Sequence, residues 1–239
     1  MSDTPLVTRV RRRLRGLPVV GPALGRVWRR LGGTPDTHFD GSASYRERRY
    51  ATGGNSGAGS YDALAVFKAE VLNAFVEEHG VTDVIEFGCG DGNQLELATY
   101  PAYVGYDVSS RAVGLCRERF AGDDTRRFAL TSDYRGETAE LTLSLDVIFH
   151  LVEDEVFDDY MARLFDASSR WVIVYSSDTD EQRDGVAPHV RHRAFSRWVA
   201  QHRPGFRLVQ HIPNRHPWAG DPTTGSFADF YVFEKVDAG

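Results

Sequence analysis

Short apolar runs recur through the chain, and segments with helical spacing separate most of them. The runs lie at 84–87, 103–106, 128–130, 141–149, 171–175, 206–209 and 230–233. Runs of this length, bounded by polar or glycine-rich turns, are typical of buried strands, and alternation with helices favours parallel pairing. The last two runs lack a helical crossover and indicate an antiparallel pair. The pattern predicts a doubly wound α/β sheet of seven strands, with helices on both faces and the antiparallel pair at the C-terminal end.

Composition divides the chain into a basic arm and one domain. The arm and its linker occupy residues 1–44, and the domain occupies 45–239. Within the domain we expect a lid and helix over 45–79, a strand–helix core over 80–178, and acceptor loops with closing strands over 179–239. A length of 239 residues with 41% hydrophobic content is enough for one domain of this kind.

The arm differs in charge from the rest of the chain. Residues 1–35 hold eight arginines and one acid, a net +7, so a total of −6 leaves −13 for the remainder. Such a basic segment can contact an anionic membrane surface or an acidic partner protein, or it can be a solvated tail. The acidic body would repel nucleic-acid phosphates, so we expect no nucleic-acid partner.

The N-terminal sequence and the cysteine content favour a reducing compartment for the protein. Residues 1–16 lack the uninterrupted apolar run of a secretory signal, and no apolar stretch approaches the roughly 20 residues of a membrane span. Cys89 and Cys116 give no reason to propose a disulfide or a zinc site. We expect a cytoplasmic protein, with membrane association only through the arm; the sequence does not indicate an oligomeric state.

The stretch from Glu86 to Gly92 carries the strongest functional signal. It reads Glu-Phe-Gly-Cys-Gly-Asp-Gly at the end of an apolar strand, and Asp107 ends the next apolar run. Glycines let a ligand approach backbone amides, and an acid at this spacing accepts hydrogen bonds from ribose hydroxyls. Glu86 would repel a pyrophosphate but would attract an ammonium group. The competing interpretation is an ordinary tight turn with Asp107 as a helix cap.

These residues, together with Ser132-Asp133 and the Ser144–His150 segment, resemble the class I S-adenosylmethionine-dependent methyltransferases. The resemblance covers about the middle half of the chain and implies S-adenosylmethionine as the cofactor. The residues that we expect to bind it are Tyr50, Asn55, Ser56, Glu86, Gly88, Cys89, Gly90, Asp107, Val108, Ser132, Asp133 and Leu145.

A loop rich in glycine and serine, residues 51–61, precedes the first predicted core helix, Asp62 to Glu78. Ordering such a loop is entropically unfavourable unless it binds something. Large anchors, Tyr45, Tyr50 and Tyr61, flank it, which favours a lid over the cofactor rather than a flexible linker.

Candidate catalytic groups follow the fourth and fifth strands. His150 is the first candidate for a general base towards a hydroxyl nucleophile, although a role in bracing the loop is an equal alternative. Asp146 and Asp178, at neighbouring strand ends, would suit Mg²⁺, whereas Asp146 would otherwise cap a helix. The residues that we expect at the acceptor are Tyr61, His189, His192, Arg215 and Trp218.

A looser likeness to bacterial methyltransferases of polysaccharide and glycoconjugate assembly implies a sugar hydroxyl as the methyl acceptor. The polar residues of the predicted acceptor loops suit a sugar. Two alternatives stay open. One is O- or N-methylation of another small molecule, and the other is a cofactor-binding scaffold without turnover that acts through the basic arm.

Overall fold

The computed structural model of the protein describes residues 39, 41–182 and 187–236. The basic arm, residues 1–35, and its predicted membrane or partner contact lie outside these residues. The helices and strands in chain order are α3 (Ser42–Ala51), η1 (Ala58–Ser60), α4 (Asp62–His79), β1 (Asp83–Phe87), η2 (Gln94–Leu97), β2 (Ala102–Asp107), α5 (Ser110–Arg119), β3 (Arg126–Leu130), η3 (Thr131–Asp133), β4 (Ala139–Leu145), η4 (Ile148–His150), α6 (Asp154–Asp166), β5 (Ser168–Ser176), α7 (Phe195–His202), β6 (Phe206–Ile212) and β7 (Asp229–Lys235).

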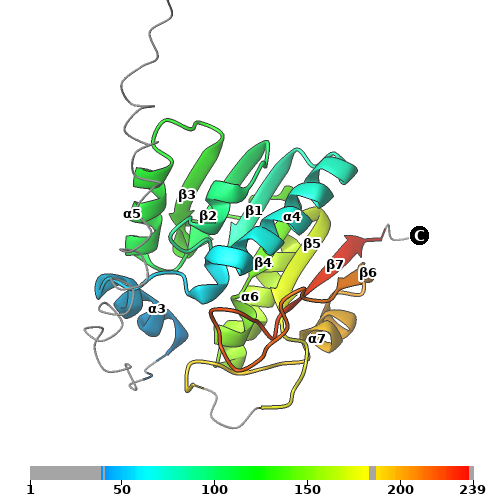
Figure 1. Cartoon of the computed structure of the whole chain (residues 1–239). Coiled ribbons are helices and arrows are strands. Elements are labelled where there is room, and N and C mark those ends of the chain that lie inside the picture. The colour runs from blue at the N-terminus through cyan, green and yellow to red at the C-terminus, as the bar shows by residue number, and fades with distance from the viewer. Residues whose placement is uncertain (1–38, 40, 183–186, 237–239) are drawn as a thin grey trace, which may run out of the picture. The chain divides into compact units, whose positions relative to one another are not determined.

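The strands form one mixed sheet in the order β3-β2-β1-β4-β5-β7-β6 (Figure 1). The first five pair in parallel, and β7 lies antiparallel to both β5 and β6. The predicted doubly wound α/β sheet with its antiparallel C-terminal pair is confirmed. The order reverses between β1 and β4, and ligands of such sheets bind beyond the strand ends at this reversal.

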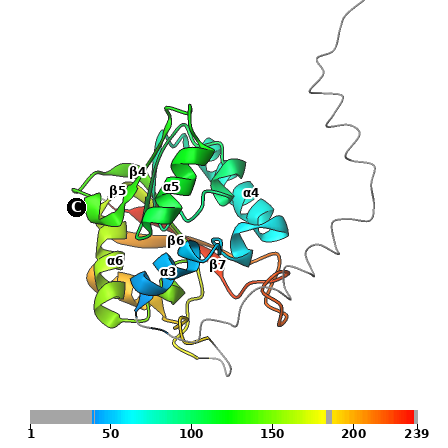
Figure 2. The same cartoon turned by 90° about the vertical axis from the view of Figure 1, so that its left-hand side faces the viewer.

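Each face of the sheet has its own apolar core. Phe67 and Leu72 of α4 and Cys116 of α5 pack on one face, with Leu141 and Ile173 from the strands. The other face packs α6 and α7 against a second set of strand residues. Figure 2 shows α4 and α6 on opposite sides of the sheet. Side chains of successive strand residues point to opposite faces, so each buried strand serves both cores.

The helix predicted to start at Asp62 is α4, and its end follows from one residue. Gly80 adopts the left-handed conformation at the C-terminus, where its amide bonds to Glu77, and the amide of Val81 bonds to the carbonyl of Val76. Glycine adopts this conformation without strain, and the two bonds satisfy carbonyls that the helix end leaves open. The chain then enters β1 directly.

Two sequence predictions about the core connections need correction. Helices were predicted between most of the apolar runs, but the segment between β1 and β2 holds only the short 3₁₀ helix η2 after the glycine turn. The fourth strand was expected to run through Phe149. It ends at Leu145, since Asp146 takes a left-handed φ of 58° that strand geometry does not allow.

The helix α3 lies in a region where the sequence predicted only a linker and a lid. Ser42, its first residue, donates its backbone amide to Glu153 over 2.9 Å. Figure 1 places α3 at the end of the sheet towards which the parallel strands run. The position matters because ligands bind at that end.

Among the described residues, no helix is long and apolar enough to cross a membrane.

A glycine in β2 tests how closely this strand packs against the turn that follows β1. A Cβ added at Gly105 would lie 2.8 Å from the Cβ of Cys89, whereas one added at Gly114 in α5 would meet nothing within 4 Å. We expect Gly105→Ala to lower the free energy of unfolding by about 1–3 kcal/mol. Gly114→Ala should raise it by about 0.5–1 kcal/mol, because alanine loses less entropy in a helix. Urea denaturation measures both, and equal effects would contradict the described packing.

Candidate functional site

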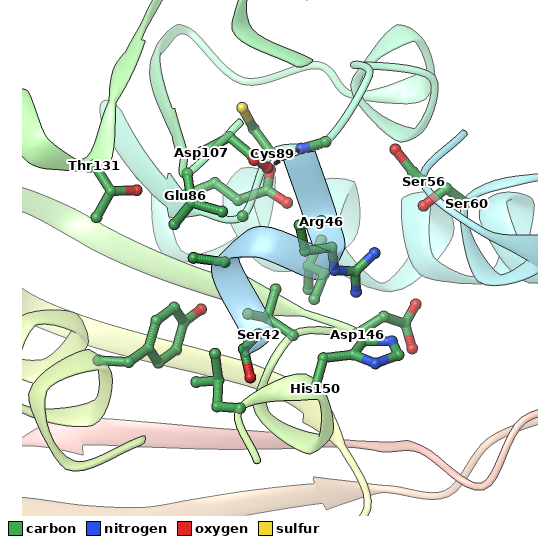
Figure 3. A pocket seen from close by; sticks show the side chains of 18 of the residues that line it. Ser42, Arg46, Ser56, Ser60, Glu86, Cys89, Asp107, Thr131, Asp146 and His150 are labelled. Carbon is green, nitrogen blue, oxygen red and sulfur yellow. Dashed lines mark hydrogen bonds between the residues drawn. The ribbon is translucent and has the colours of Figure 1, made fainter. Parts of the chain in front are cut away.

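A cavity of about 230 Å³ lies at the carboxyl ends of β1, β2 and β4 (Figure 3). Its walls come from α3, the turn after β1, the strand ends, η4 and α6. Many residues predicted to bind the cofactor or to act in catalysis line it: Tyr50, Ser56, Glu86, Gly88, Cys89, Gly90, Asp107, Val108, Leu145, Asp146 and His150. The sequence therefore identified the strand-end part of this cavity.

The glycine turn after β1 depends on backbone conformations that suit glycine. Gly88 and Gly90 have φ values of 91° and 61°, and a Cβ at Gly90 would collide with the hydroxyl oxygens of Ser56 and Tyr50. Asp107 stabilises the turn from β2, because its Oδ2 accepts the Gly90 amide over 2.9 Å. The other carboxylate oxygen accepts the amide of Ser109 over 2.9 Å. Burial raises the pKa of Asp107.

Glu86 is buried at the end of β1 beside the turn. Tyr103 donates its hydroxyl to Glu86 Oε2 over 2.7 Å. Burial nevertheless raises the pKa of Glu86 to about 7, since the hydrogen bond from Tyr103 and the charge of Lys68 offset only part of the desolvation. A cationic ligand group in the cavity would favour the charged carboxylate.

The loop between α3 and α4 closes directly on the glycine turn. Asp91 Oδ2 accepts the amide of Ser56 over 3.1 Å and the hydroxyl of Tyr61 over 2.8 Å. In return the Asp91 amide donates to Ser56 Oγ over 2.8 Å, and this oxygen also lies 3.0 Å from the hydroxyl of Tyr50. Burial opposes the charge on Asp91, but these hydrogen bonds outweigh it and lower the pKa of the carboxyl. These hydrogen bonds hold the loop against the glycine turn, and its role as a lid stays a prediction.

An ion pair lies in the wall between α4 and β4. Lys68 Nζ contacts Asp146 Oδ2 at 2.7 Å, and the lysine side chain is 1% exposed. Its ammonium group also lies 5.3 Å from the centre of the Tyr175 ring. The loop packs on the same carboxylate, since a Cβ at Gly59 would lie 2.5 Å from Asp146 Oδ2. The pair therefore connects helix, strand end and lid.

His150 is held in one tautomer. Its Nδ1 lies 3.0 Å from the carbonyl oxygen of His189, and because a carbonyl only accepts, Nδ1 carries the hydrogen. In the neutral ring, Nε2 is then an acceptor, and it has no hydrogen-bond partner within the described part of the chain. Burial, aided by the nearby charge of Arg46, lowers the pKa of His150 well below its usual value. The lowered pKa favours the neutral ring.

The predicted magnesium pair does not fit these contacts. Asp146 is neutralised by Lys68, and Asp178 accepts the backbone amide of Ser196 over 3.0 Å. Throughout residues 39, 41–182 and 187–236, no three His, Cys, Asp or Glu side chains come together as a metal site.

Other predicted residues do not line the cavity. Asn55 accepts hydrogen bonds from Arg49 in the loop, while Ser132 and Asp133 are exposed in η3, where Thr131 lines the cavity instead.

The five residues predicted at the acceptor also lie outside the lining. Tyr61 binds Asp91, and Arg215 forms an exposed ion pair with Glu70. His192 is buried against Ser177, and Trp218 is 37% exposed. His189 comes nearest to the site, because its ring stacks on Tyr45 at 4.3 Å and lies 5.5 Å from the ring of His150.

Sequence reasoning missed several lining residues, above all Arg46 and Lys68. Lys68 did carry a signal, since it occupies the apolar stripe of α4 between Leu64 and Leu72 at helical spacing. A charged residue in a buried stripe needs a partner. Arg46 carried no such signal, because the arginine-rich sequence around it is typical of a solvated segment.

Comparison with known proteins agrees with this geometry at the level of the fold. No protein-family profile and no curated protein matches the sequence. Among solved structures, the N-methyltransferase NodS from Bradyrhizobium japonicum WM9, in complex with S-adenosylhomocysteine, has a TM-score of 0.61 at 13% identity; the match covers 83% of this chain and 100% of NodS.

Two further structures give the same result. Magnesium protoporphyrin IX methyltransferase ChlM from Synechocystis PCC 6803, with bound SAH, has a TM-score of 0.54 at 16% identity, covering 90% of this chain and 95% of ChlM. The methyltransferase domain of bacterial CtHen1-C has a TM-score of 0.55 at 19% identity, covering 72% of this chain and 98% of the domain. The chain has the class I methyltransferase fold. In this fold the cavity at β1, β2 and β4 lies where the strand order reverses.

The ion pair in the cavity wall can be tested by unfolding. Lys68→Met leaves the carboxylate of Asp146 without its partner, and breaking a buried pair costs about 3–5 kcal/mol. Adding Asp146→Asn removes the unpaired charge, and asparagine tolerates the left-handed backbone. We expect the double variant to recover much of the loss in urea denaturation. A double variant no more stable than Lys68→Met would contradict the pairing.

The raised pKa of Glu86 predicts a pH dependence of both stability and ligand affinity. The folded carboxyl holds its proton up to about pH 7, above its ordinary value of 4.5. Its contribution to stability is therefore complete below the ordinary value and is lost as pH rises through about 7. A ligand ammonium favours the charged form, so affinity for S-adenosylhomocysteine should rise between about pH 6 and 8. Calorimetry should show this rise in the wild type and a flat profile in Glu86→Gln; a rise in both would exclude Glu86 as the cause.

Proposed function

We propose that the protein transfers a methyl group from S-adenosylmethionine to a hydroxyl group of a polar acceptor, with a sugar as the first class to test. The observation that carries the proposal is the convergence of Glu86, Asp107 and the glycine turn on one cavity, under a loop already bonded to that turn. Methyltransferases of the same fold bind this cofactor or its product.

The residues present fit such a cofactor. The backbone of Gly88 and Gly90 can approach a ligand closely, and Asp107, the predicted acid of the second strand, would accept hydrogen bonds from ribose hydroxyls. Glu86 provides a carboxylate for an ammonium group. When bound, the cofactor supplies an activated methyl group on a sulfonium. The loop fastened by Asp91 would exclude water from that end of the cavity.

His150 is the group best suited to accept the proton of the attacking hydroxyl. Its Nδ1 is fixed by the carbonyl of His189, so Nε2 is the basic atom. The lowered pKa keeps the ring unprotonated and able to accept. In the transfer, the acceptor oxygen would bond to the methyl carbon as the carbon–sulfur bond of the sulfonium breaks with its electron pair going to sulfur, and the acceptor's proton would pass to Nε2 of His150. A hydroxyl needs this assistance more than a neutral amine does, which supports O-methylation over N-methylation.

Replacement of His150 distinguishes a general base from a residue that only supports the loop. We expect His150→Ala to lower kcat by about a hundredfold or more while affinity for S-adenosylhomocysteine stays near wild type. In the wild type the acid limb of the kcat profile should lie below pH 6.5, because the pKa of His150 is lowered. His211→Ala, at an exposed position in β6, is the matched control. Near-wild-type turnover in His150→Ala would contradict the proposed role.

The activity itself is tested by release of S-adenosylhomocysteine from S-adenosylmethionine in the presence of sugars, other hydroxylated small molecules and amines. Turnover dependent on a hydroxylated acceptor supports the proposal. Turnover with amines alone would favour the N-methyltransferase alternative. Cofactor binding without turnover across the panel would favour the scaffold alternative, in which the basic arm recruits a partner.

A further inference from the structure

Arg46 has no protein partner in the cavity, although it points into it. The guanidinium is half-buried, lines the cavity, and has neither a hydrogen bond nor an ion pair among the residues that the structure describes. Figure 3 shows it extending from α3 into the space bordered by Asp146 and His150. An arginine carries five donors in a planar fork, and leaving them unpaired in a partly desolvated site is unfavourable.

Among the described residues, no acid forms a hydrogen bond or an ion pair with Arg46. Glu47, the next residue of α3, accepts the hydroxyl of Ser110 over 2.9 Å, and Glu153 binds Ser42 at the start of the helix. Asp146 is paired with Lys68 at 2.7 Å. Asp107 attracts Arg46 electrostatically but forms no hydrogen bond or ion pair with it among the described residues, and its two oxygens accept the backbone amides of Gly90 and Ser109. None of these carboxylates satisfies the guanidinium fork.

Two other arginines lie at or near the cavity. Arg163 lines the cavity on α6, one helical turn from Asp159, which also lines it. Arg49 donates to the backbone oxygen of Asn55 over 2.7 Å and has no carboxylate partner within the described ranges. Arg49 therefore adds positive potential beside Arg46 without competing for its ligand.

The charge of Arg46 acts on the side of the cavity where the proposed base lies. Burial and the charge of Arg46 together lower the pKa of both His150 and His189. The charges that act on Glu86 at the opposite side come from Lys68, Asp107 and Asp146. Figure 3 shows the guanidinium beside Asp146 and His150, next to which the acceptor hydroxyl is proposed to lie.

We propose that Arg46 binds an anionic group, a carboxylate or a phosphate, on the methyl acceptor. This inference rests on the proposed function and narrows its substrate class to hydroxylated acids, such as a sugar acid or a sugar phosphate. Two parallel hydrogen bonds from the fork orient the anion, and orientation places the acceptor hydroxyl towards Nε2 of His150. The charge from Arg49 strengthens the attraction.

Inorganic phosphate is the probe for this site, because it tests the anion site without knowledge of the acceptor. The full chain, saturated with S-adenosylhomocysteine, is titrated with phosphate by calorimetry at constant ionic strength. We expect saturable binding that weakens by about fivefold or more in Arg46→Gln and partly returns in Arg46→Lys. The control is Arg111→Gln, an exposed arginine of α5 outside the cavity lining, with affinity unchanged.

A second titration tests the competing role, in which Arg46 binds the carboxylate of the cofactor itself. The titration is repeated on protein saturated with 5′-methylthioadenosine, which lacks that carboxylate. Arg46-dependent phosphate binding only in this complex would overturn the proposal in favour of the cofactor. Phosphate binding that does not depend on Arg46 in either complex would overturn it as well. If S-adenosylhomocysteine fails to bind at all, the proposed function fails first, and that result is visible before phosphate is added.

Discussion

The ion pair between Lys68 and Asp146 holds together the segments that form the cavity. It joins α4 to the end of β4, and the loop before α4 packs on the same carboxylate through Gly59. The left-handed backbone at Asp146 ends the strand and turns the chain into η4, which presents His150. A buried charge must be paired, so helix, strand end and loop are constrained to one arrangement. The position of His150, the proposed base, therefore depends on the ion pair that Asp146 makes four residues earlier in the chain.

Charge is divided between two sides of the cavity. Glu86 and Asp107 are acids whose pKa values burial raises, and a cationic or hydroxylated ligand would relieve that desolvation. On the other side, Arg46 and a neutral His150 provide a donor and an acceptor. Opposite charges on the two sides suit a reaction between a cationic methyl donor and an acceptor with an anionic group. Lys68 and Asp146 also lie in the cavity wall, where their opposite charges neutralise each other.

The features that the sequence predicted are those that depend on the local order of residues along the chain. The apolar runs gave the strands, and the spacing from Gly88 to Asp107 placed the turn and its acid together, because parallel strands end at one edge. Partners far apart in sequence were not predictable: Lys68 and Asp146 are separated by 78 positions, and Ser56 and Asp91 by 35. Trp218 and Arg215 carried plausible chemistry for an acceptor site but lie outside the cavity lining, since composition does not show which loops reach it.

We propose that the cavity under the loop binds S-adenosylmethionine through Asp107 and Glu86. Calorimetric titration of the full chain with S-adenosylhomocysteine tests it most directly, with Asp107→Ala beside the wild type. We expect one site per chain with a Kd in the micromolar range, and an affinity for S-adenosylhomocysteine about tenfold or more lower in Asp107→Ala. No binding by a folded wild-type chain, or equal binding by both proteins, would contradict it.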